Sequence, residues 1–237
     1  MTQSVRVLRG RASTIEDDRA ASGRLLEVAA EGERAVRVWT PHRQVAFGRR
    51  DSRLEGYEMA RSAAAEHGFP PVQRRVGGRA VVYDGTTTLA FARAEPVADF
   101  RRGTDDRYER LTSDVENALD GLGLEVSRGE PADSFCPGAH SLSLTAGKAN
   151  APRKVVGIAQ RVQREAAVVS GIAIVTGAHE LAAVLEAVYG ALDVPFDRRS
   201  VGSLALANQD IGYEAVRDAL ESALVGDDRA VIEPVES

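Results

Sequence analysis

The sequence is poor in the residues that build disulfide bonds and metal sites. It contains a single cysteine, Cys136, and four histidines scattered along the chain. One cysteine excludes an internal disulfide and a multi-cysteine metal site, and the histidines show no zinc-ligand spacing. We therefore expect neither a disulfide framework nor a bound metal.

Long apolar runs are also missing. No run approaches the roughly 20 residues that cross a bilayer, and residues 1–14 lack the apolar stretch of a signal peptide. The net charge of −5 offers no general attraction to nucleic acid. These absences predict a cytoplasmic protein with neither membrane nor nucleic-acid partners.

Lysine is the scarcest charged residue. Of 30 basic residues only Lys148 and Lys154 are lysines. Arginine is tolerated almost everywhere in this chain, so a retained lysine suggests work that needs a compact ammonium able to lose its proton. Lys154 lies in the same segment as Cys136, and a nearby cation makes a thiol a better nucleophile. The alternative is an arginine-biased composition with a small buried cysteine of no chemical role.

Apolar periodicity predicts a chain of alternating helices and strands. Helices are expected over residues 14–30, 55–67, 105–122, 179–192 and 211–224, and strands over 5–8, 35–39, 44–47, 72–76, 80–83, 87–92, 141–144, 155–162 and 167–175. This order predicts one α/β (α+β) domain over residues 1–227, with a single-layer mixed, mostly antiparallel sheet flanked by helices. The acidic residues 228–237 are expected to be frayed.

Three segments combine glycine with reactive or basic residues. They are QRRVGGRAVVYD at 73–84, SFCPG at 134–138 followed by the strand SLSL, and RKVVGIAQR at 153–161. Each segment has a purely structural alternative: a Gly-Gly hairpin turn, a Pro-Gly loop with an incidental cysteine, and a strand interrupted by Gly157. A fourth segment, VAFGRR at 45–50, ends in Gly-Arg.

Taken together and in this order, the segments resemble the biotin/lipoate protein ligase and octanoyltransferase superfamily. Its signature is an arginine before Gly-Gly and a strand, followed by an invariant lysine, and the resemblance covers residues 5–190. FCPG, SLSL and KVVGIAQR are most similar to the cysteine-dependent octanoyl-[glycine cleavage H protein]:protein N-octanoyltransferase (amidotransferase) branch. The resemblance implies the catalytic-domain fold of biotin and lipoate ligases, and acyl transfer to lysines of lipoyl domains.

The resemblance also implies roles for individual residues. Cys136 would be the nucleophile and would hold the acyl group as a thioester, with Lys154 beside the carbonyl. The substrate-binding residues would be Arg74 at the mouth of an acyl tunnel together with Gly77, Gly78, Gly138 and Gly157. His140, four residues from the cysteine, is a competing base. This mechanism requires no cofactor; octanoyl or lipoyl is its substrate.

The expected partners are lipoyl carrier domains, namely the glycine cleavage H protein and the E2 subunits of 2-oxoacid dehydrogenases. A basic patch of Arg49, Arg50, Arg74 and Arg75 would attract these acidic domains.

Two alternatives remain open from the sequence. One is a lipoate-protein ligase that uses ATP and has no need of Cys136. The other is a non-catalytic relative that binds acyl-carrier domains or fatty acid. Departures from the family pattern at Val76, Arg79 and residues 86–88 keep the non-catalytic relative open. Arg79 and residues 86–88 also depart from the glycine motif of the ligases, and so favour acyl transfer through Cys136 over adenylation. The sequence distinguishes neither the acyl donor nor octanoyl from lipoyl.

Overall fold

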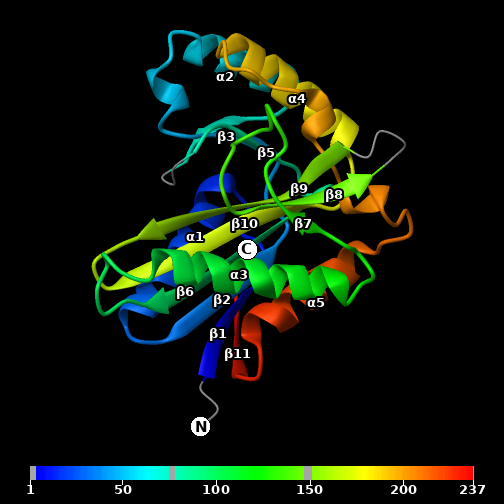
Figure 1. Cartoon of the computed structure of the whole chain (residues 1–237). Coiled ribbons are helices and arrows are strands. Elements are labelled where there is room, and N and C mark those ends of the chain that lie inside the picture. Colours follow the sequence, from blue (N-terminus) through cyan, green and yellow to red (C-terminus); the bar gives the residue numbers. More distant parts are fainter. Residues whose placement is uncertain (1–3, 75–77, 147–150, 237) are drawn as a thin grey trace.

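The computed structural model describes residues 4–74, 78–146 and 151–236, and its centre is one large mixed sheet (Figure 1). The order of its eight strands is β11-β1-β2-β6-β10-β9-β8-β7. Strand β1 is parallel to both of its neighbours, β11 and β2, and the other neighbouring pairs are antiparallel. The bounds are β1 Ser4–Arg9, β2 Arg34–Trp39, β6 Thr88–Pro96, β7 Ser127–Arg128, β8 Ser141–Ala146, β9 Ala151–Val162, β10 Ala166–Ile174 and β11 Arg229–Pro234. The predicted fold class is confirmed.

Helices cover both faces of this sheet (Figure 1). Helices α3 (Thr104–Asp120) and α5 (Tyr213–Val225) pack on one face, and α1 (Ile15–Ala30) packs on the other. Neighbouring residues of a strand point to opposite faces. Val38 accordingly belongs to the core under α3 and α5, whereas Trp39 packs with α1.

A second layer stands at one end of the large sheet. Strands β3 (Gln44–Phe47), β4 (Pro71–Gln73) and β5 (Val81–Tyr83) form a small sheet in the order β4-β3-β5. Helices α2 (Tyr57–Glu66) and α4 (Ala178–Ala191) share its core, which also takes in Phe135 and Ile172 from the large sheet and its loops. Short 3₁₀ helices lie at Asp51–Arg53, Arg198–Ser200 and Leu204–Leu206. The sequence predicted these strands but not their separation into a sheet of their own.

The local signals behind the helix predictions are present. The Thr14 side chain accepts a hydrogen bond from the backbone N–H of Asp17 at 3.1 Å and so caps α1. Gly68, just after α2, has a φ of 77°, a conformation that glycine adopts at little cost. Both helices therefore begin or end near the residues expected from the sequence.

The predicted fraying of residues 228–237 is wrong for most of that segment. Residues 229–234 form β11, which pairs with β1 from Ser4↔Arg229 to Arg9↔Pro234. The acidic side chain of Glu233 pairs with Arg6 at 3.0 Å and with Arg24 at 2.6 Å. Without β11, the edge of β1 would leave backbone N–H and C=O groups unpaired, and the segment 229–234 pairs with them. Arg6 on β1 also attracts Glu233, so the acidic composition that predicted fraying instead helps the strand to pair.

A membrane-spanning helix was not expected, and within the described ranges no helix combines the length and apolar character that spanning would need.

Candidate active site

Cys136 lies in the loop between β7 and β8 with an unusual backbone conformation. Its φ is 41°, in the left-handed region that residues other than glycine seldom occupy. The Tyr189 hydroxyl of α4 accepts a hydrogen bond from the backbone N–H of Cys136 at 2.6 Å, and itself donates to the carbonyl of Ala80 at 3.1 Å. Backbone strain of this kind persists only where the surroundings impose it, and it is concentrated at functional sites.

Lys154 of β9 holds the same loop from the sheet side. Its ammonium donates to the carbonyl of Phe135 at 2.9 Å and to that of Cys136 at 3.0 Å, and to both carboxylate oxygens of Glu130 at 3.1 Å. The side chain is only 1% exposed. The structure thus brings together the two residues predicted to be catalytic, and joins the lysine to the cysteine through its backbone carbonyl.

The surroundings of Lys154 act on its pKa in opposite directions. Burial lowers the pKa below the ordinary lysine value, and the positive charge of Arg74 acts in the same direction. The charges of Glu130 and Cys136 oppose this shift. The net shift is downward, so Lys154 loses its proton more easily than an ordinary lysine, and the Glu130 carboxylate limits this shift by favouring the ammonium form.

The cation in contact with sulfur is Arg74, the residue that follows β4. Its guanidinium donates from Nη2 to the Cys136 Sγ at 3.0 Å and to the carbonyl of Arg79 at 2.7 Å. Burial works to lower the pKa of Arg74, but the charges of Cys136 and Tyr83 outweigh it and the pKa is raised. The Nε of Arg74 is buried and has no hydrogen-bond partner in the described part of the chain. Arg74 thus contacts the sulfur of Cys136 through Nη2, and among the described residues its Nε remains an unpaired donor.

An apolar cavity of about 870 Å³ opens beside the sulfur, between α1 and the large sheet. Cys136, Lys154, Arg74 and Tyr83 all line it. The rest of its lining is largely apolar, including Leu25, Leu26, Trp39, Val72, Val81, Ala90, Ala92, Ile158, Val168 and Ile172. Such a cavity can bury a hydrocarbon chain whose first carbon is bonded to Cys136.

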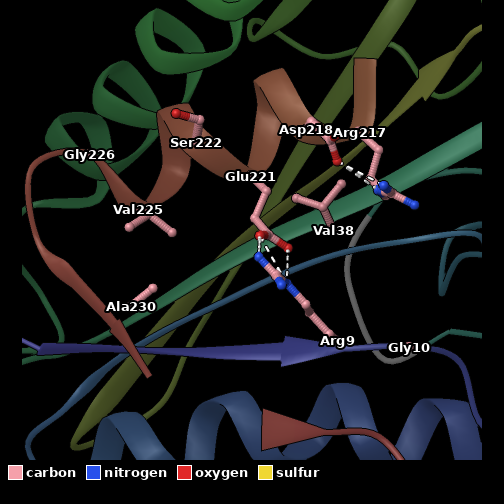
Figure 2. A pocket seen from close by; sticks show the side chains of 10 residues that line it. All are labelled: Arg9, Gly10, Val38, Arg217, Asp218, Glu221, Ser222, Val225, Gly226 and Ala230. Atoms are coloured by element: carbon pink, nitrogen blue, oxygen red, sulfur yellow. Dashed lines mark hydrogen bonds and ion pairs between the residues drawn. The ribbon is translucent and has the colours of Figure 1, made fainter. Parts of the chain in front are cut away.

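A second hollow, of about 630 Å³, lies on the opposite face of the sheet beside α5 (Figure 2). Its charged side chains pair with one another: Arg9 Nε donates to Glu221 at 3.1 Å, and Arg217 Nη2 donates to Asp218 at 2.8 Å (Figure 2). These charged groups pair with one another, and among residues 4–74, 78–146 and 151–236 no cysteine or lysine lines the hollow. The cavity at Cys136 is therefore the candidate active site.

Comparison with known proteins identifies the family of this chain. The family model of the lipoyl protein ligase A/B catalytic domain matches residues 19–225. The chain belongs to this family. An octanoyl-[GcvH]:protein N-octanoyltransferase from Exiguobacterium sibiricum is 34% identical over 137 residues, which are 56% of this chain and 46% of that protein. The chain thus spans about half the length of the curated relatives that it matches.

Solved structures of lipoate-protein ligases share the fold. A crystal structure of lipoate-protein ligase A bound with ATP has a TM-score of 0.76 at 20% identity and covers 99% of this chain and 89% of its own. A bi-partite lipoate protein ligase from Thermoplasma acidophilum, described with its E2 lipoyl domain, has a TM-score of 0.70 at 18% identity, covering 98% and 88%. At these identities the likeness shows the fold of the lipoyl protein ligase A/B family.

The glycines predicted to bind substrate fall into different settings in this family member. Gly78 has a φ of 99°, and a Cβ on it would lie 2.6 Å from both the Cys136 sulfur and the Arg74 Nη2. At Gly157 a Cβ would lie 3.3 Å from the Cε of Lys154. Gly138 faces open space, and its N–H donates to Glu130 at 3.1 Å. Gly77 lies outside the described residues. Among the three of these glycines that the structure describes, only at Gly78 would a side chain collide with the sulfur, and its positive φ also favours glycine.

This difference predicts unequal effects of adding a methyl group. In Gly78→Ala the Cβ would displace the thiol or the guanidinium by about 1 Å, and a displacement of that size can cost on the order of 100-fold in rate. Gly138→Ala, the matched control, is expected to change stability by less than about 0.5 kcal/mol and to leave the thiol unaffected. The rate of Cys136 alkylation by iodoacetamide, followed by intact mass, measures both. Equal rates in the two variants would contradict the assignment.

The structure separates the remaining sequence candidates. His140 stacks on Tyr108 of α3, with ring centroids 4.0 Å apart and planes 4° apart, so its ring packs against that helix. Arg49 and Arg50 are exposed after β3, as a docking patch requires. Arg74 does not belong to that surface patch, because its half-buried guanidinium donates a hydrogen bond to the sulfur. Arg75 lies outside the described residues.

Departures from the family pattern have local structural roles. The Arg79 guanidinium lies 3.4 Å from the carboxylate of Asp51, a buried residue that accepts the N–H of Gly48 at 2.8 Å. Thr86 donates its N–H and its hydroxyl to Asp84 at 2.9 and 2.8 Å and so shapes the turn before β6. Val76 lies outside the described residues. Two residues that sequence reasoning missed, Glu130 and Tyr189, hold the cysteine loop, and no local motif marks either of them.

Proposed function

We propose that this chain transfers an octanoyl or lipoyl group to a lysine of lipoyl carrier domains through a thioester on Cys136. The observation that carries the proposal is the half-buried guanidinium of Arg74, which lies 3.0 Å from the only thiol of the chain at the wall of an apolar cavity. The name of the Exiguobacterium relative, which specifies octanoyl transfer from GcvH, supports the same reaction.

The reaction runs in two transfers with balanced atoms. The Cys136 thiolate attacks the donor carbonyl, a C–S bond forms, and the donor amine departs with the proton that the thiol has lost. The acceptor lysine then attacks the thioester, the new amide forms as the C–S bond breaks, and the thiolate is regenerated as the amine gives up a proton. Thiolate is suited to both steps because it attacks readily and also leaves readily.

Charge that develops on the carbonyl oxygen needs a donor at the site. Arg74 provides one, since its Nε has no partner in the described residues while its Nη2 contacts the sulfur. The apolar cavity would bury the acyl chain, and eight carbons contribute on the order of 6 kcal/mol at about 0.8 kcal/mol each. Lys154 holds the cysteine loop in position through its hydrogen bonds to the carbonyls of Phe135 and Cys136, and it adds positive charge on the sheet side of that loop.

The proposed acceptors and donors are the glycine cleavage H protein and E2 lipoyl domains. Exposed Arg49 and Arg50 would meet their acidic surfaces. The relative's name mentions GcvH, and the Thermoplasma ligase is described with an E2 lipoyl domain. A cytoplasmic location and the lack of a required cofactor stay predictions.

A donor panel tests the proposal. Purified protein is mixed with an apo lipoyl domain and one of three donors: octanoylated H protein, octanoyl-acyl carrier protein, or free lipoate with ATP. The mass of each intact protein is then measured. We expect an octanoyl adduct on Cys136 and then on the acceptor. Lipoate-dependent release of pyrophosphate with Cys136 unmodified would instead favour the ligase. Binding of the lipoyl domain without transfer from any donor would favour the non-catalytic relative.

A further inference from the structure

Glu130 lies at the centre of a hydrogen-bond cluster beneath the cysteine loop. Its carboxylate accepts hydrogen bonds from Lys154 Nζ, from the hydroxyls of Ser134 and Ser141, and from the backbone N–H of Gly138. The sequence offers no motif that would single it out. Four donors on one carboxylate are more than a surface ion pair provides, so the side chain has a defined place in the site.

The donors bound by Glu130 bracket Cys136 in the chain. Ser134 and Gly138 lie two residues before it and two after it, and Lys154 extends the cluster to the carbonyls of Phe135 and Cys136. On the other side the Tyr189 hydroxyl holds the Cys136 N–H. The left-handed backbone of Cys136 is therefore held between α4 and the Glu130–Lys154 pair.

Glu130 also provides the negative charge that Lys154 needs. Among the described residues, the charges with the largest effect on the Lys154 ammonium are those of Glu130, Cys136 and Arg74. Arg74 is positive, and Cys136 is neutral whenever its thiol is protonated or acylated. Glu130 is the carboxylate among them, and at 21% exposure it retains some contact with water while Lys154 has almost none. A buried ammonium without its partner is strongly disfavoured.

We propose that Glu130 is a positioning residue for acyl transfer: it keeps Lys154 an ammonium and, through that ammonium, holds the Cys136 loop so that the sulfur meets Arg74. This inference rests on the proposed function for its kinetic consequence, but its structural part concerns the lysine and the thiol alone. The hydrogen-bond partners of Glu130 among the described residues are Lys154 and the loop around Cys136, so we assign it a role that acts through them.

Replacing the carboxylate with an amide tests the charge at constant size. In Glu130→Gln the burial of Lys154 still lowers its pKa, but the largest opposing influence is gone. As the pH rises, Lys154 therefore loses its proton at a lower pH in Glu130→Gln than in the wild type. We expect the high-pH limb of kcat to move down by about one pH unit or more, and kcat at pH 7.5 to fall about tenfold, with KM for the donor nearly unchanged.

Two further variants sharpen the comparison. Glu130→Asp keeps the charge and should keep the pH profile while lowering kcat, because the shorter side chain loses some of its donors. Glu116→Gln removes another ion-paired carboxylate, one on α3 that pairs with Arg128 of β7 at 2.6 Å, and should leave both the profile and kcat unchanged. A loss of thermal stability in Glu130→Gln without a change in the pH profile would make Glu130 merely structural and overturn the proposal.

A direct readout needs no acyl transfer. Because the chain has only two lysines, ¹³C-lysine labelling gives two Cε signals, and Lys154→Arg assigns them. We expect the Lys154 signal to titrate at a lower pH in Glu130→Gln than in the wild type and in Glu130→Asp, and iodoacetamide to alkylate Cys136 more slowly.

Unchanged titration and alkylation would refute the positioning role even if the donor panel succeeds. Changed values with no transfer from any donor would leave the role intact and count against the proposed function. If Glu130→Gln does not fold, a titration of Lys154 in Glu130→Asp that differs from the wild type by more than about one unit overturns the proposal.

Discussion

Cys136→Ser is expected to reduce acyl transfer by at least about 1,000-fold, because a serine hydroxyl at neutral pH is a far weaker nucleophile than a thiol next to a cation. The fold should survive, since serine is slightly smaller and its hydroxyl can still accept the hydrogen bond from Arg74. The acyl adduct should vanish from the intact-mass spectrum together with the activity.

The lone thiol makes this test unambiguous. With one cysteine in the chain, any covalent adduct at sulfur is at Cys136, and thiol titration should fall from one equivalent to none in the variant. Activity within about tenfold of the wild type would remove Cys136 as the nucleophile and would leave the ATP-dependent ligase as the better proposal.

Lys154→Arg is expected to lower acyl transfer by at least about 100-fold while keeping the positive charge. A guanidinium is planar and larger than an ammonium, so it cannot donate to the carbonyls of Phe135 and Cys136 and to Glu130 in the same arrangement. The cysteine would then be displaced from Arg74. Because Lys154 is buried, we also expect a loss of about 1–3 kcal/mol in stability from overpacking, which the sequence alone did not suggest.

Two controls separate the kinetic effect from the stability effect. Val115→Ala, in the core under α3, should destabilise the fold by a comparable amount without changing activity at 25 °C. Lys148→Arg, in the segment outside the described residues, should be silent in both measurements. If Lys154→Arg transfers acyl groups as fast as Val115→Ala does, the lysine has no special role.

The predictable part of this protein is what periodicity and short motifs encode. The amphipathic pattern over residues 14–30 predicted α1, which Thr14 caps at its N-terminus, and the strand predicted over 44–47 is β3. Cys136 and Lys154 were predicted as site residues because cysteine and lysine are scarce in the chain and because their segments resemble family motifs. In the fold the two residues are in contact through the Cys136 carbonyl.

What escaped prediction depends on contacts between distant residues. Tyr189 reaches Cys136 from α4, and Glu130 gains its role only because β9 brings Lys154 under the loop. Neither side chain belongs to a pattern that a reader of the sequence could find. The strand at 229–234 was missed for the same reason, since its partner is the first strand of the sheet.

The pairing of β11 with β1 has a consequence for how the chain folds. Residue 4 pairs with residue 229, so this edge of the sheet closes only when segments from opposite ends of the described chain have met. Contacts of such long sequence separation form late and slowly. Until then β1 presents an unpaired edge that could accept a strand from another molecule. We expect misassembly during refolding to begin at this edge rather than at the active site.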